Sequence, residues 1–348
     1  ASKDMTVSAL DNTIYNGEEQ KFEPVVKDGE KTLAKGVDYD LSYSDDVTNA
    51  GTVTVTVTGK GNYTGTATVT YKINKRPVVL VSNGGTKYYD GTALEDHDVV
   101  VTSKYDFVAG EIEDLKANGF ITEPGEVTNN ITYTKTDNYR DSNYDVKITE
   151  GTLKVLPRDL NATGMEISKL DDVVYNGLDQ KQAAEVKDSK TGKTLVAGTD
   201  YDVKYSDDTK NVGEVTVTIT GKGNYTGAAT RTYKITPAPL TVTTESASQV
   251  YSGRELTAPG TITGFVNGES VDFKTTGKQK SVGSSANTYS IDWTGSKKTN
   301  YRIVSESIGM LAVTESAQTI VVATLGGRYE YDGTTHTPTV NVYNLPDG

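Results

Sequence analysis

The heptapeptide Gly-Lys-Gly-Asn-Tyr-Thr-Gly occurs twice in this chain, at residues 59–65 and again at residues 221–227. In each copy it follows a run in which Val or Ile alternates with Thr, and a second alternating run comes after it. Neighbouring side chains on a strand point to opposite faces, so this pattern buries Val and Ile and leaves Thr in water. The three glycines supply the backbone angles of a tight connection. The sequence therefore predicts a strand, a glycine-rich turn and a second strand, present in two copies.

The chain also repeats on a larger scale. Gly59 and Gly221 are as far apart as Tyr89-Asp90-Gly91 and Tyr251-Ser252-Gly253, so one long period holds two different kinds of segment. Each segment has about 80 residues, a size that can hold one small core. Prolines near the junctions predict short, stiff joints. We name the predicted modules A1 (residues 1–75), B1 (76–157), A2 (158–237), B2 (238–316) and the start of a fifth repeat (317–348).

Composition and charge restrict the function classes. The 348 residues include no cysteine, which excludes disulfides and thiol catalysis. The formal net charge of −12 argues against nucleic-acid partners and anionic membrane surfaces. No stretch approaches the roughly 20 apolar residues of a membrane span, so we expect no membrane insertion. The chain opens without a signal peptide, and we interpret it as a fragment of a longer protein that is monomeric in this region.

The predicted fold class is all-β, because Val, Thr and Tyr dominate the alternating segments. We expect four tandem small β-sandwich modules of immunoglobulin-like type, arranged as an elongated rod. For the B modules the alternative is a β-grasp-like sheet with one short helix. That helix would span residues 111–118, with Ile112 and Leu115 on one face and Gly119 at the C-terminal cap.

Two local features give sharper predictions. Tyr-Asn-Gly at residues 15–17 and 175–177 is typical of a type I′ hairpin turn, because Asn-Gly favours positive backbone angles. In the last strand of A1, Val69 shares a face with core residues, whereas A2 carries Arg231 at the matching position. Burying an arginine is costly. We therefore expect this position to be at least partly exposed in both copies.

The repeated motifs resemble modules of large Gram-positive bacterial surface proteins. The A modules, with Tyr-Asn-Gly, Asp-Tyr-Asp, Ser-Asp-Asp and the glycine-rich heptapeptide, resemble bacterial immunoglobulin-like repeats of cell-wall adhesins. The B modules, with Tyr-Asp-Gly or Tyr-Ser-Gly early and Gly-x-Leu late, resemble MBG/YDG-type repeats. The resemblance implies an extracellular location at the cell surface or cell wall and a role in cell adhesion. It supplies no catalytic residues.

Catalytic and metal sites find little support in the sequence. The two histidines, His97 and His336, lie in different modules without metal-ligand spacing. We predict no enzyme activity and no cofactor. Acidic clusters are the best candidates for Ca²⁺, which needs several converging oxygens, but adjacent strand residues point to opposite faces. We favour turn residues on a solvated edge over a calcium site. The clustered residues are Asp38, Asp40, Asp45 and Asp46, and Asp200, Asp202, Asp207 and Asp208.

Three aromatic residues are candidates for ligand binding. Tyr63 and Tyr225 occupy the repeated glycine-rich loops, where an exposed ring would stack on a sugar or a partner. The alternative, which we favour, is that each tyrosine folds back over its own core. Trp293 shares strand parity with Tyr289 and Ile291, and its counterpart in B1 is Lys135. We favour a place at the rim of the core for Trp293.

Three functions follow as hypotheses. The first is a non-catalytic stalk or spacer in a bacterial surface protein that takes part in cell adhesion. The second is a module that binds an extracellular glycan or a host surface protein. The third is an accessory region of a secreted polysaccharide-degrading enzyme, with its chemistry outside this sequence.

Overall fold

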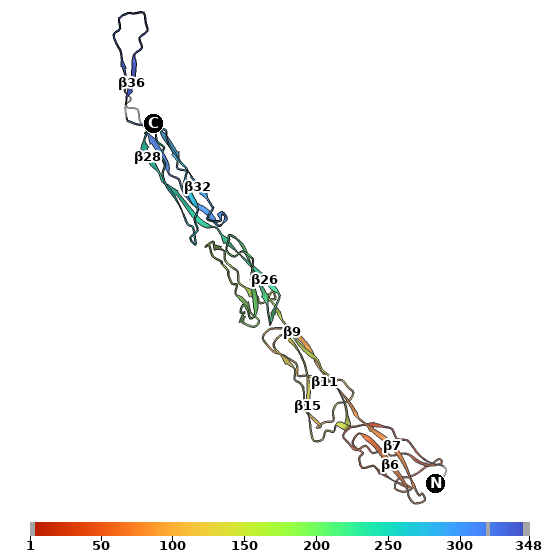
Figure 1. Ribbon diagram of the computed structural model, residues 1–348. Coiled ribbons are helices and arrows are strands. Elements are labelled where there is room, and N and C mark those ends of the chain that lie inside the picture. Colours follow the sequence, from red (N-terminus) through yellow and green to blue (C-terminus); the bar gives the residue numbers. More distant parts are fainter. Residues whose placement is uncertain (1–3, 318–320, 344–348) are drawn as a thin grey trace. The chain divides into compact units, whose positions relative to one another are not determined.

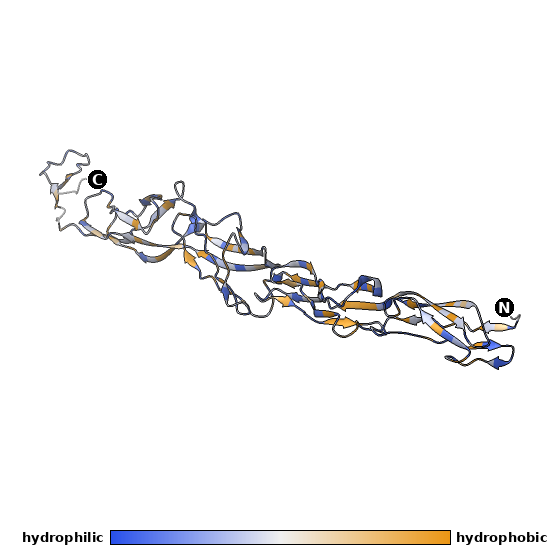
Figure 2. Cartoon of the chain, turned by 90° about the horizontal axis from the view of Figure 1, so that it is seen from below, coloured by the Kyte–Doolittle hydropathy of each residue, from blue (hydrophilic) through white to orange (hydrophobic). Residues whose placement is uncertain are grey.

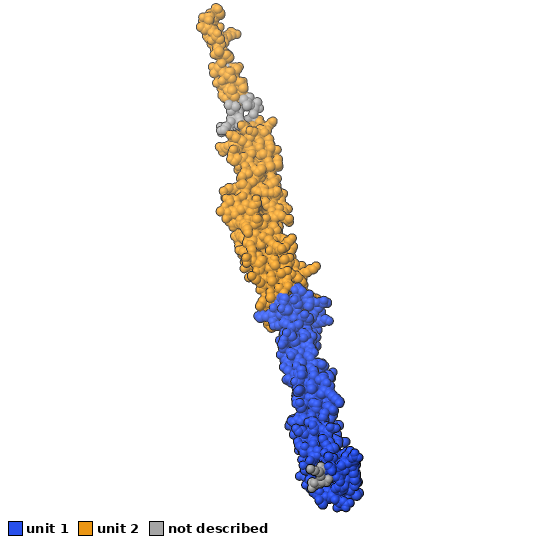
Figure 3. All heavy atoms as spheres, turned by 90° about the vertical axis from the view of Figure 1, so that its right-hand side faces the viewer, with its two compact units in different colours: residues 1–164, 189–193, 221–227 blue, residues 165–188, 194–220, 228–348 orange. Residues whose placement is uncertain are grey.

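The structure is a computed structural model that describes residues 4–317 and 321–343. The described residues form an all-β chain of small two-sheet modules, with two single-turn 3₁₀ helices and no α-helix among them (Figure 1). Two compact units are distinguished (Figure 3). Unit 1 comprises residues 1–164, 189–193 and 221–227, and unit 2 comprises residues 165–188, 194–220 and 228–348.

A1, in unit 1, pairs a four-stranded sheet (β2-β7-β6-β5) with a three-stranded one (β1-β3-β4). Strands β6 and β7 pair antiparallel on either side of the first heptapeptide. The valines of β6 are buried and its threonines are not, which confirms the alternation. Figure 2 colours the chain by hydropathy, and both apolar and polar stretches occur on its strands. The strands are β1 (Met5–Val7), β2 (Thr13–Ile14), β3 (Val26–Asp28), β4 (Lys31–Thr32), β5 (Tyr39–Tyr43), β6 (Gly51–Gly59) and β7 (Thr66–Asn74).

B1, also in unit 1, contains two three-stranded sheets, β11-β8-β16 and β14-β17-β9, and two short pairs, β10-β13 and β12-β15. Parallel pairing joins β8 to β16 and β9 to β17. The elements are β8 (Arg76–Ser82), β9 (Gly85–Tyr88), β10 (Leu94–Glu95), β11 (Val99–Val101), β12 (Ile112–Ala117), β13 (Phe120–Ile121), β14 (Gly125–Thr128), β15 (Ile131–Lys135), η1 (Asp141–Asn143), β16 (Tyr144–Thr149) and β17 (Thr152–Leu156).

The predicted helix at residues 111–118 is wrong, because this segment forms strand β12. The register of β12 against β15 shifts between Glu113 and Lys116, as in a β-bulge. Asp114 there has a positive φ of 53°. The extra residue brings Ile112 and Leu115, three apart, to the same core, which imitates helical spacing. The β-grasp alternative therefore loses its helix.

A third short pairing completes unit 1. Strand β18 (Arg158–Asp159) pairs in parallel with β25 (Tyr225–Thr226), which lies within the second heptapeptide. The segment that follows B1 in the chain is thus bound to the glycine-rich loop at residues 221–227.

Unit 2 repeats both kinds of module. A2 has the sheets β20-β26-β24-β23 and β19-β21-β22, and B2 has β29-β27-β33, β28-β34-β31 and β30-β32. The elements are β19 (Met165–Ile167), β20 (Val173–Val174), β21 (Val186–Asp188), β22 (Lys193–Thr194), β23 (Tyr201–Tyr205), β24 (Gly213–Gly221), β26 (Ala228–Thr236), β27 (Ala238–Thr244), β28 (Ala247–Val250), β29 (Gly260–Thr263), β30 (Asp272–Thr275), β31 (Gly283–Ala286), β32 (Tyr289–Asp292), η2 (Lys298–Asn300), β33 (Tyr301–Ser307) and β34 (Met310–Thr314). The hairpin β35 (Val321–Leu325) and β36 (Thr339–Tyr343) follows.

Two local predictions have different outcomes. Tyr-Asn-Gly is not a type I′ hairpin turn, because only its glycine has a positive φ (86° at Gly17, 79° at Gly177). The preceding strand β2 moreover pairs in parallel with β7, so no hairpin forms there. The prediction for Val69 and Arg231 is confirmed, since both side chains are half-buried. The guanidinium of Arg231 donates to the carbonyl of Ile167 at 3.0 Å.

One hydrophobic cluster of unit 1 spans A1 and B1, contrary to the expectation of one small core per module, and A1 has a second, separate cluster. In the chain, a single residue, Lys75, separates the last strand of A1 (β7) from the first strand of B1 (β8). Burying apolar surface at this junction stabilises both modules at once. One hydrophobic cluster contains the buried residues Tyr15, Val47, Val53, Val55, Tyr71 and Ile73 of A1 and Val78, Leu80, Phe107, Ile131 and Tyr144 of B1.

Candidate functional site: a repeated joint between modules

A carboxyl group holds A1 and B1 together in unit 1. Glu111 of B1 accepts a hydrogen bond from the Tyr15 hydroxyl of A1 through Oε1. It accepts a second one from the Tyr144 hydroxyl through Oε2, at 2.6 Å. The rings of Tyr15 and Tyr144 meet edge to face, with centroids 5.6 Å apart. All three side chains are at most 5% exposed, so bulk water does not compete for these bonds.

The surrounding backbone explains how the three side chains meet. Tyr15 directly follows β2, and its N–H donates to the carbonyl of Asn74 at the end of β7. Tyr144 begins β16, where it pairs with Arg76 at the start of β8. Gly17 lets the B1 loop approach closely, because a Cβ there would lie 2.8 Å from Cγ1 of Val108.

Asparagine provides a second bridge across the same joint. Asn143 is fully buried, and its Oδ1 accepts from the N–H of Ala50 at 2.9 Å. Its Nδ2 donates to Oδ1 of Asn49 at 2.8 Å. Asn49 is held in turn by Asp46, which accepts from the side-chain amide and the backbone N–H of Asn49, both at 2.9 Å. The bridge therefore depends on a turn in A1.

Unit 2 reproduces the carboxyl part of this joint between A2 and B2. Glu269 accepts from the hydroxyls of Tyr175, at 2.5 Å, and Tyr301, at 2.8 Å. The two rings are again edge to face, 5.5 Å apart. Gly177 again allows close approach, because a Cβ there would lie 2.5 Å from Cβ of Asn267.

The asparagine bridge also recurs in unit 2. Asn300, which is 1% exposed, accepts from the N–H of Val212 at 3.0 Å. It donates to Oδ1 of Asn211 at 2.8 Å, and Asp208 holds Asn211. Each unit thus joins an A module to a B module with the same set of polar groups.

The aromatic covering of the joint differs between the units. In B1, Tyr139 stacks on Tyr144 with ring centroids 5.1 Å apart. In B2, Trp293 stacks on Tyr301 at 6.1 Å. Trp293 is half-buried, in agreement with the expected place at the rim of the core. Its counterpart by sequence offset is Lys135, but Tyr139 has the equivalent ring contact.

Burial and the shared carboxyl change the acidity of the joint tyrosines. Desolvation, followed by the hydrogen bond to Glu111, raises the pKa of Tyr15 to about 12. The same causes raise the pKa of Tyr144. In unit 2, desolvation and the bond to Glu269 raise the pKa of Tyr301 to about 12 and also raise the pKa of Tyr175. All four hydroxyls therefore keep their protons, and so act as donors, throughout the physiological pH range.

The two tyrosines of the glycine-rich loops occupy different environments. Tyr63 is half-buried and lines a groove of about 600 Å³ at one end of A1. Tyr225 is only 2% exposed, and the ring of Tyr89 meets it edge to face at 5.8 Å. The hypothesis that both rings are displayed on loops is therefore wrong for Tyr225, because a neighbouring segment covers it. Tyr63 packs against a buried cluster of its own module, which agrees with the favoured alternative. Ligand binding by Tyr63 or Trp293 stays a prediction.

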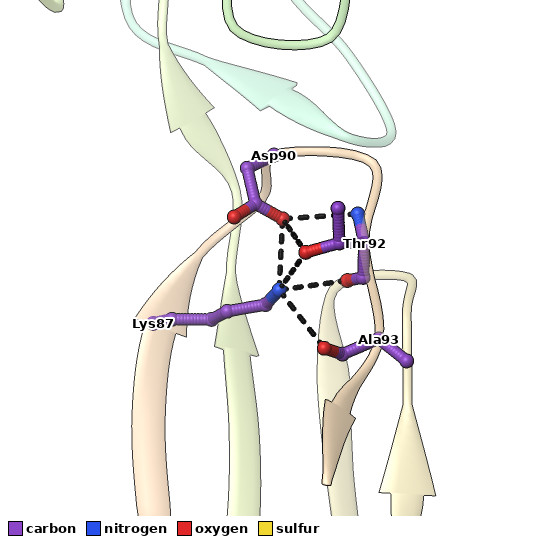
Figure 4. A network of polar contacts seen from close by, with 4 residues as sticks. All are labelled: Lys87, Asp90, Thr92 and Ala93. Carbon is purple, nitrogen blue, oxygen red and sulfur yellow. Dashed lines mark hydrogen bonds and ion pairs between the residues drawn. The ribbon is translucent and has the colours of Figure 1, made fainter.

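The Tyr-Asp-Gly turn that carries Tyr89 is held by an ion pair (Figure 4). The Lys87 ammonium lies 2.8 Å from Oδ1 of Asp90 and donates to the carbonyls of Thr92 and Ala93. The bonds from Lys87 and Thr92 lower the pKa of Asp90 to about 2. This network fixes the turn of B1 beside the loop at residues 221–227.

The clustered aspartates bond to their own turns. Asp38 accepts from the N–H of Ala34, and Asp200 accepts from that of Val196. Asp40 pairs with Lys60 at 3.3 Å. Bonds within the turns lower the pKa of Asp46 and Asp208, the backbone N–H of the following asparagine contributing most. Three further aspartates, Asp45, Asp202 and Asp207, are exposed.

The described residues contain no group of three or more acidic, His or Cys side chains arranged to hold a metal ion. Calcium binding at the aspartates stays a prediction. Within the same residues, no helix is long and apolar enough to cross a membrane. His97 hydrogen-bonds the carbonyl of Ala117, and His336 contacts Asp332.

Comparison with known proteins finds one segment that is similar to a known family. Solved structures similar to this chain include the protocadherin GammaB4 extracellular domain (12% identity over 95% of this chain and 70% of that one, TM-score 0.22). The insect immune protein hemolin (12%, 90% and 100%, 0.20) and Drosophila N-cadherin EC1-4 (9%, 88% and 98%, 0.20) are others. These likenesses are too distant to carry an argument, and no curated protein matches the chain. Residues 240–309 match the family model described as MBG domain (YGX type), which confirms the resemblance of B2 to an MBG repeat.

Proposed function

We propose that this chain is a non-catalytic repeat region of an extracellular adhesion protein on a Gram-positive bacterial surface, and that it acts as a spacer. The observation that carries the proposal is the joint itself. Two hydroxyls, one carboxyl and two asparagines recur with the same connections in both units, at Glu111 and at Glu269. A spacer requires fixed geometry between modules, and buried, fully bonded polar networks supply it.

The MBG match supports the extracellular, repetitive context of the proposal. The shared core of A1 and B1 supports the mechanical part, because relative motion of the two modules would expose apolar surface. Reaction chemistry is not needed for this role. The polar groups of both joints are used in bonds between modules.

The test measures the stiffness of one joint. The natural chain has no cysteine, so spin labels can be attached at cysteines introduced at two exposed positions of unit 1, Glu30 and Lys147. Pulsed electron spin resonance should give one narrow distance distribution. The double variant Glu111→Ala/Asn143→Ala should broaden it, while the matched variant Glu269→Ala/Asn300→Ala in unit 2 should leave it unchanged. A distribution already broad in the natural chain contradicts the spacer role.

Binding of a glycan or a host surface protein is the second candidate function. The observation that favours it is the groove lined by Tyr63, the half-buried member of the repeated tyrosine pair. The measurement is a glycan array probed with the whole chain and with Tyr63→Ala. A reproducible signal that this substitution abolishes would replace the spacer role by recognition.

A further inference from the structure

The groove beside Tyr63 lies at one end of A1, next to the first glycine-rich loop. Its apolar lining includes Val7, Val26, Leu33 and Val57. The loop at residues 59–65 forms one of its sides, through Tyr63 and its neighbours.

The second glycine-rich loop shows what such a loop receives. At residues 221–227, the loop is paired in parallel with β18. The N–H of Arg158 donates to the carbonyl of Asn224, and the N–H of Leu160 donates to the carbonyl of Thr226, both at 2.9 Å. Leu160 is 2% exposed. The loop at residues 221–227 therefore binds β18, the short strand that follows B1, and the adjacent Leu160 is buried there.

The two loops have the same backbone conformation. The N–H of Gly59 donates to the carbonyl of Gly65 at 2.9 Å, and the bond from Gly221 to Gly227 has the same length. Gly61 in the first loop has a φ of 65°, the same as its counterpart in the second. The backbone of loop 59–65 thus already has the geometry of the loop that receives β18, which lowers the cost of ordering it on binding.

The hydrogen-bond acceptors used by the strand are also present on the first loop. Asn62 and Thr64 correspond to Asn224 and Thr226. Within the described residues, no backbone N–H donates to the carbonyl of Asn62 or Thr64. Two acceptors at alternate residues beside an apolar groove are the requirement for adding a strand to a sheet edge.

We propose that this groove docks the exit strand of a B-type module joined ahead of A1, in the register of Arg158-Asp159-Leu160. The chain itself sets the register, because β1 pairs with β3 as β19 pairs with β21, from Met5 and from Met165. Counting back from Met165 to Leu160 and equally from Met5 places the leucine directly before Ala1. The leucine side chain fills the groove, and the tyrosine of a Tyr-Asp-Gly turn covers Tyr63 as Tyr89 covers Tyr225. The inference goes beyond the spacer role, since it concerns how successive modules dock and does not depend on what the row of modules presents.

The experiment places the segment Arg158-Asp159-Leu160 of a B module directly before Ala1, in the proposed register and without a designed linker. Residues 1–160, which contain a complete A1–B1 pair, are fused directly ahead of residues 1–348. The fusion contains Tyr63 twice, so the leading copy carries Tyr63→Phe. The Tyr63 that remains belongs to the full-length copy and reports on the loop that should be docked. Tyrosine nitration is followed by peptide mass spectrometry, with the buried Tyr225 as internal reference. Nitration of Tyr63 should be at least tenfold slower than in the natural chain and approach the rate of Tyr225.

A matched fusion separates docking from mere crowding. The same chain with Leu160→Asp at the fusion junction keeps every module but loses the apolar anchor, and should restore the faster nitration of Tyr63. Unchanged nitration in the first fusion, or equal slowing in both fusions, would overturn the proposal. So would a Tyr63-dependent glycan signal that the fusion leaves at full strength, since the groove would then belong to a ligand. An unaltered rate at Tyr225 verifies that the modules have folded.

Discussion

The joints at Glu111 and at Glu269 have the same polar skeleton in different surroundings. Glu111 and the neighbouring Phe107 are buried, whereas Glu269 and the matching Phe265 are half-buried. The hydrogen bonds remain the same while the apolar covering varies. Geometry at these joints is thus set by the polar groups, and the covering determines how strongly water competes with them. The predictions below use this difference, from the largest expected effect to the smallest.

Removing the carboxyl groups should give the largest difference in stability loss between the two joints. Glu111→Ala leaves two buried tyrosine hydroxyls without an acceptor, and we expect a loss of about 3–5 kcal/mol in the stability of unit 1. Glu269→Ala should cost only about 1–3 kcal/mol in unit 2, because Glu269 is half-buried and water can take its place beside the two tyrosine hydroxyls. Native-state hydrogen exchange, read separately for the amides of each unit, measures both. Equal losses would show that the apolar covering does not matter.

The asparagine bridges should behave alike in the two units. Asn143 and Asn300 are at most 1% exposed and make the same bonds. We therefore expect Asn143→Ala and Asn300→Ala each to cost about 2–3 kcal/mol, from lost bonds and from buried groups left without partners. Exchange of the Ala50 and Val212 amides reports each site directly. Asn138→Ala, at an exposed position, is the control. Stability losses that differ several-fold between Asn143→Ala and Asn300→Ala would contradict the equivalence of the two asparagine bridges.

Both joints should weaken in alkali. The folded pKa values of Tyr15 and Tyr301 are raised to about 12, above the ordinary value of 10.0. A raised folded pKa gives stabilisation that is complete below the unfolded value and lost as pH rises toward the folded one. Between pH 9 and 11 each tyrosine should cost its unit about 1 kcal/mol. Urea unfolding at the two pH values measures this loss, and Tyr15→Phe should reduce it in unit 1 alone. A pH-independent midpoint would rule out the linkage.

The smallest expected effect concerns a turn that only one B module stabilises with charge. B1 has Lys87 and Asp90, whereas B2 has Gln249 and Ser252 at the matching positions. Asp90 is partly exposed, so Asp90→Asn should cost below about 1 kcal/mol. Since the folded pKa of Asp90 is lowered to about 2, the contribution is present above the unfolded value and lost as pH falls through about 2. Ser252→Asn in B2 serves as the comparison. A larger effect in B2 would contradict this account.

Much of the fold was predictable, because Val/Thr alternation reports directly which face of a strand is buried. The valines of β6 are an example. The bulge in β12 was not predictable, since one inserted residue gives Ile112 and Leu115 the spacing of a helix. The burial of Tyr225 agrees with the favoured alternative, but its contact with Tyr89 of B1 was not predictable. The pairing of the second glycine-rich loop with β18 was not predictable either, because β18 is too short to give a periodic signal.

The joint was missed, although the sequence contains a signal for it. Glu111 and Glu269 occur in the matching stretches Phe-Val-x-Gly-Glu, and Asn143 and Asn300 each stand directly before a tyrosine. Polar residues that recur outside strand patterns indicate a shared buried contact. Sequence alone does not give the partner, because Tyr15 and Glu111 meet only through tertiary structure.

The parallel pairing of the first and late strands in each B module has a consequence for a chain under tension. In B1, β8 pairs with β16 from Arg76↔Tyr144 to Val81↔Thr149, and in B2, β27 pairs with β33 in the same sense. A pull on the two ends of such a module drags these neighbours lengthwise in opposite directions. The hydrogen bonds between the two strands then bear the load simultaneously. In a hairpin that is pulled apart from its open end, they would break one after another. These modules are thus built to withstand stretching along the chain.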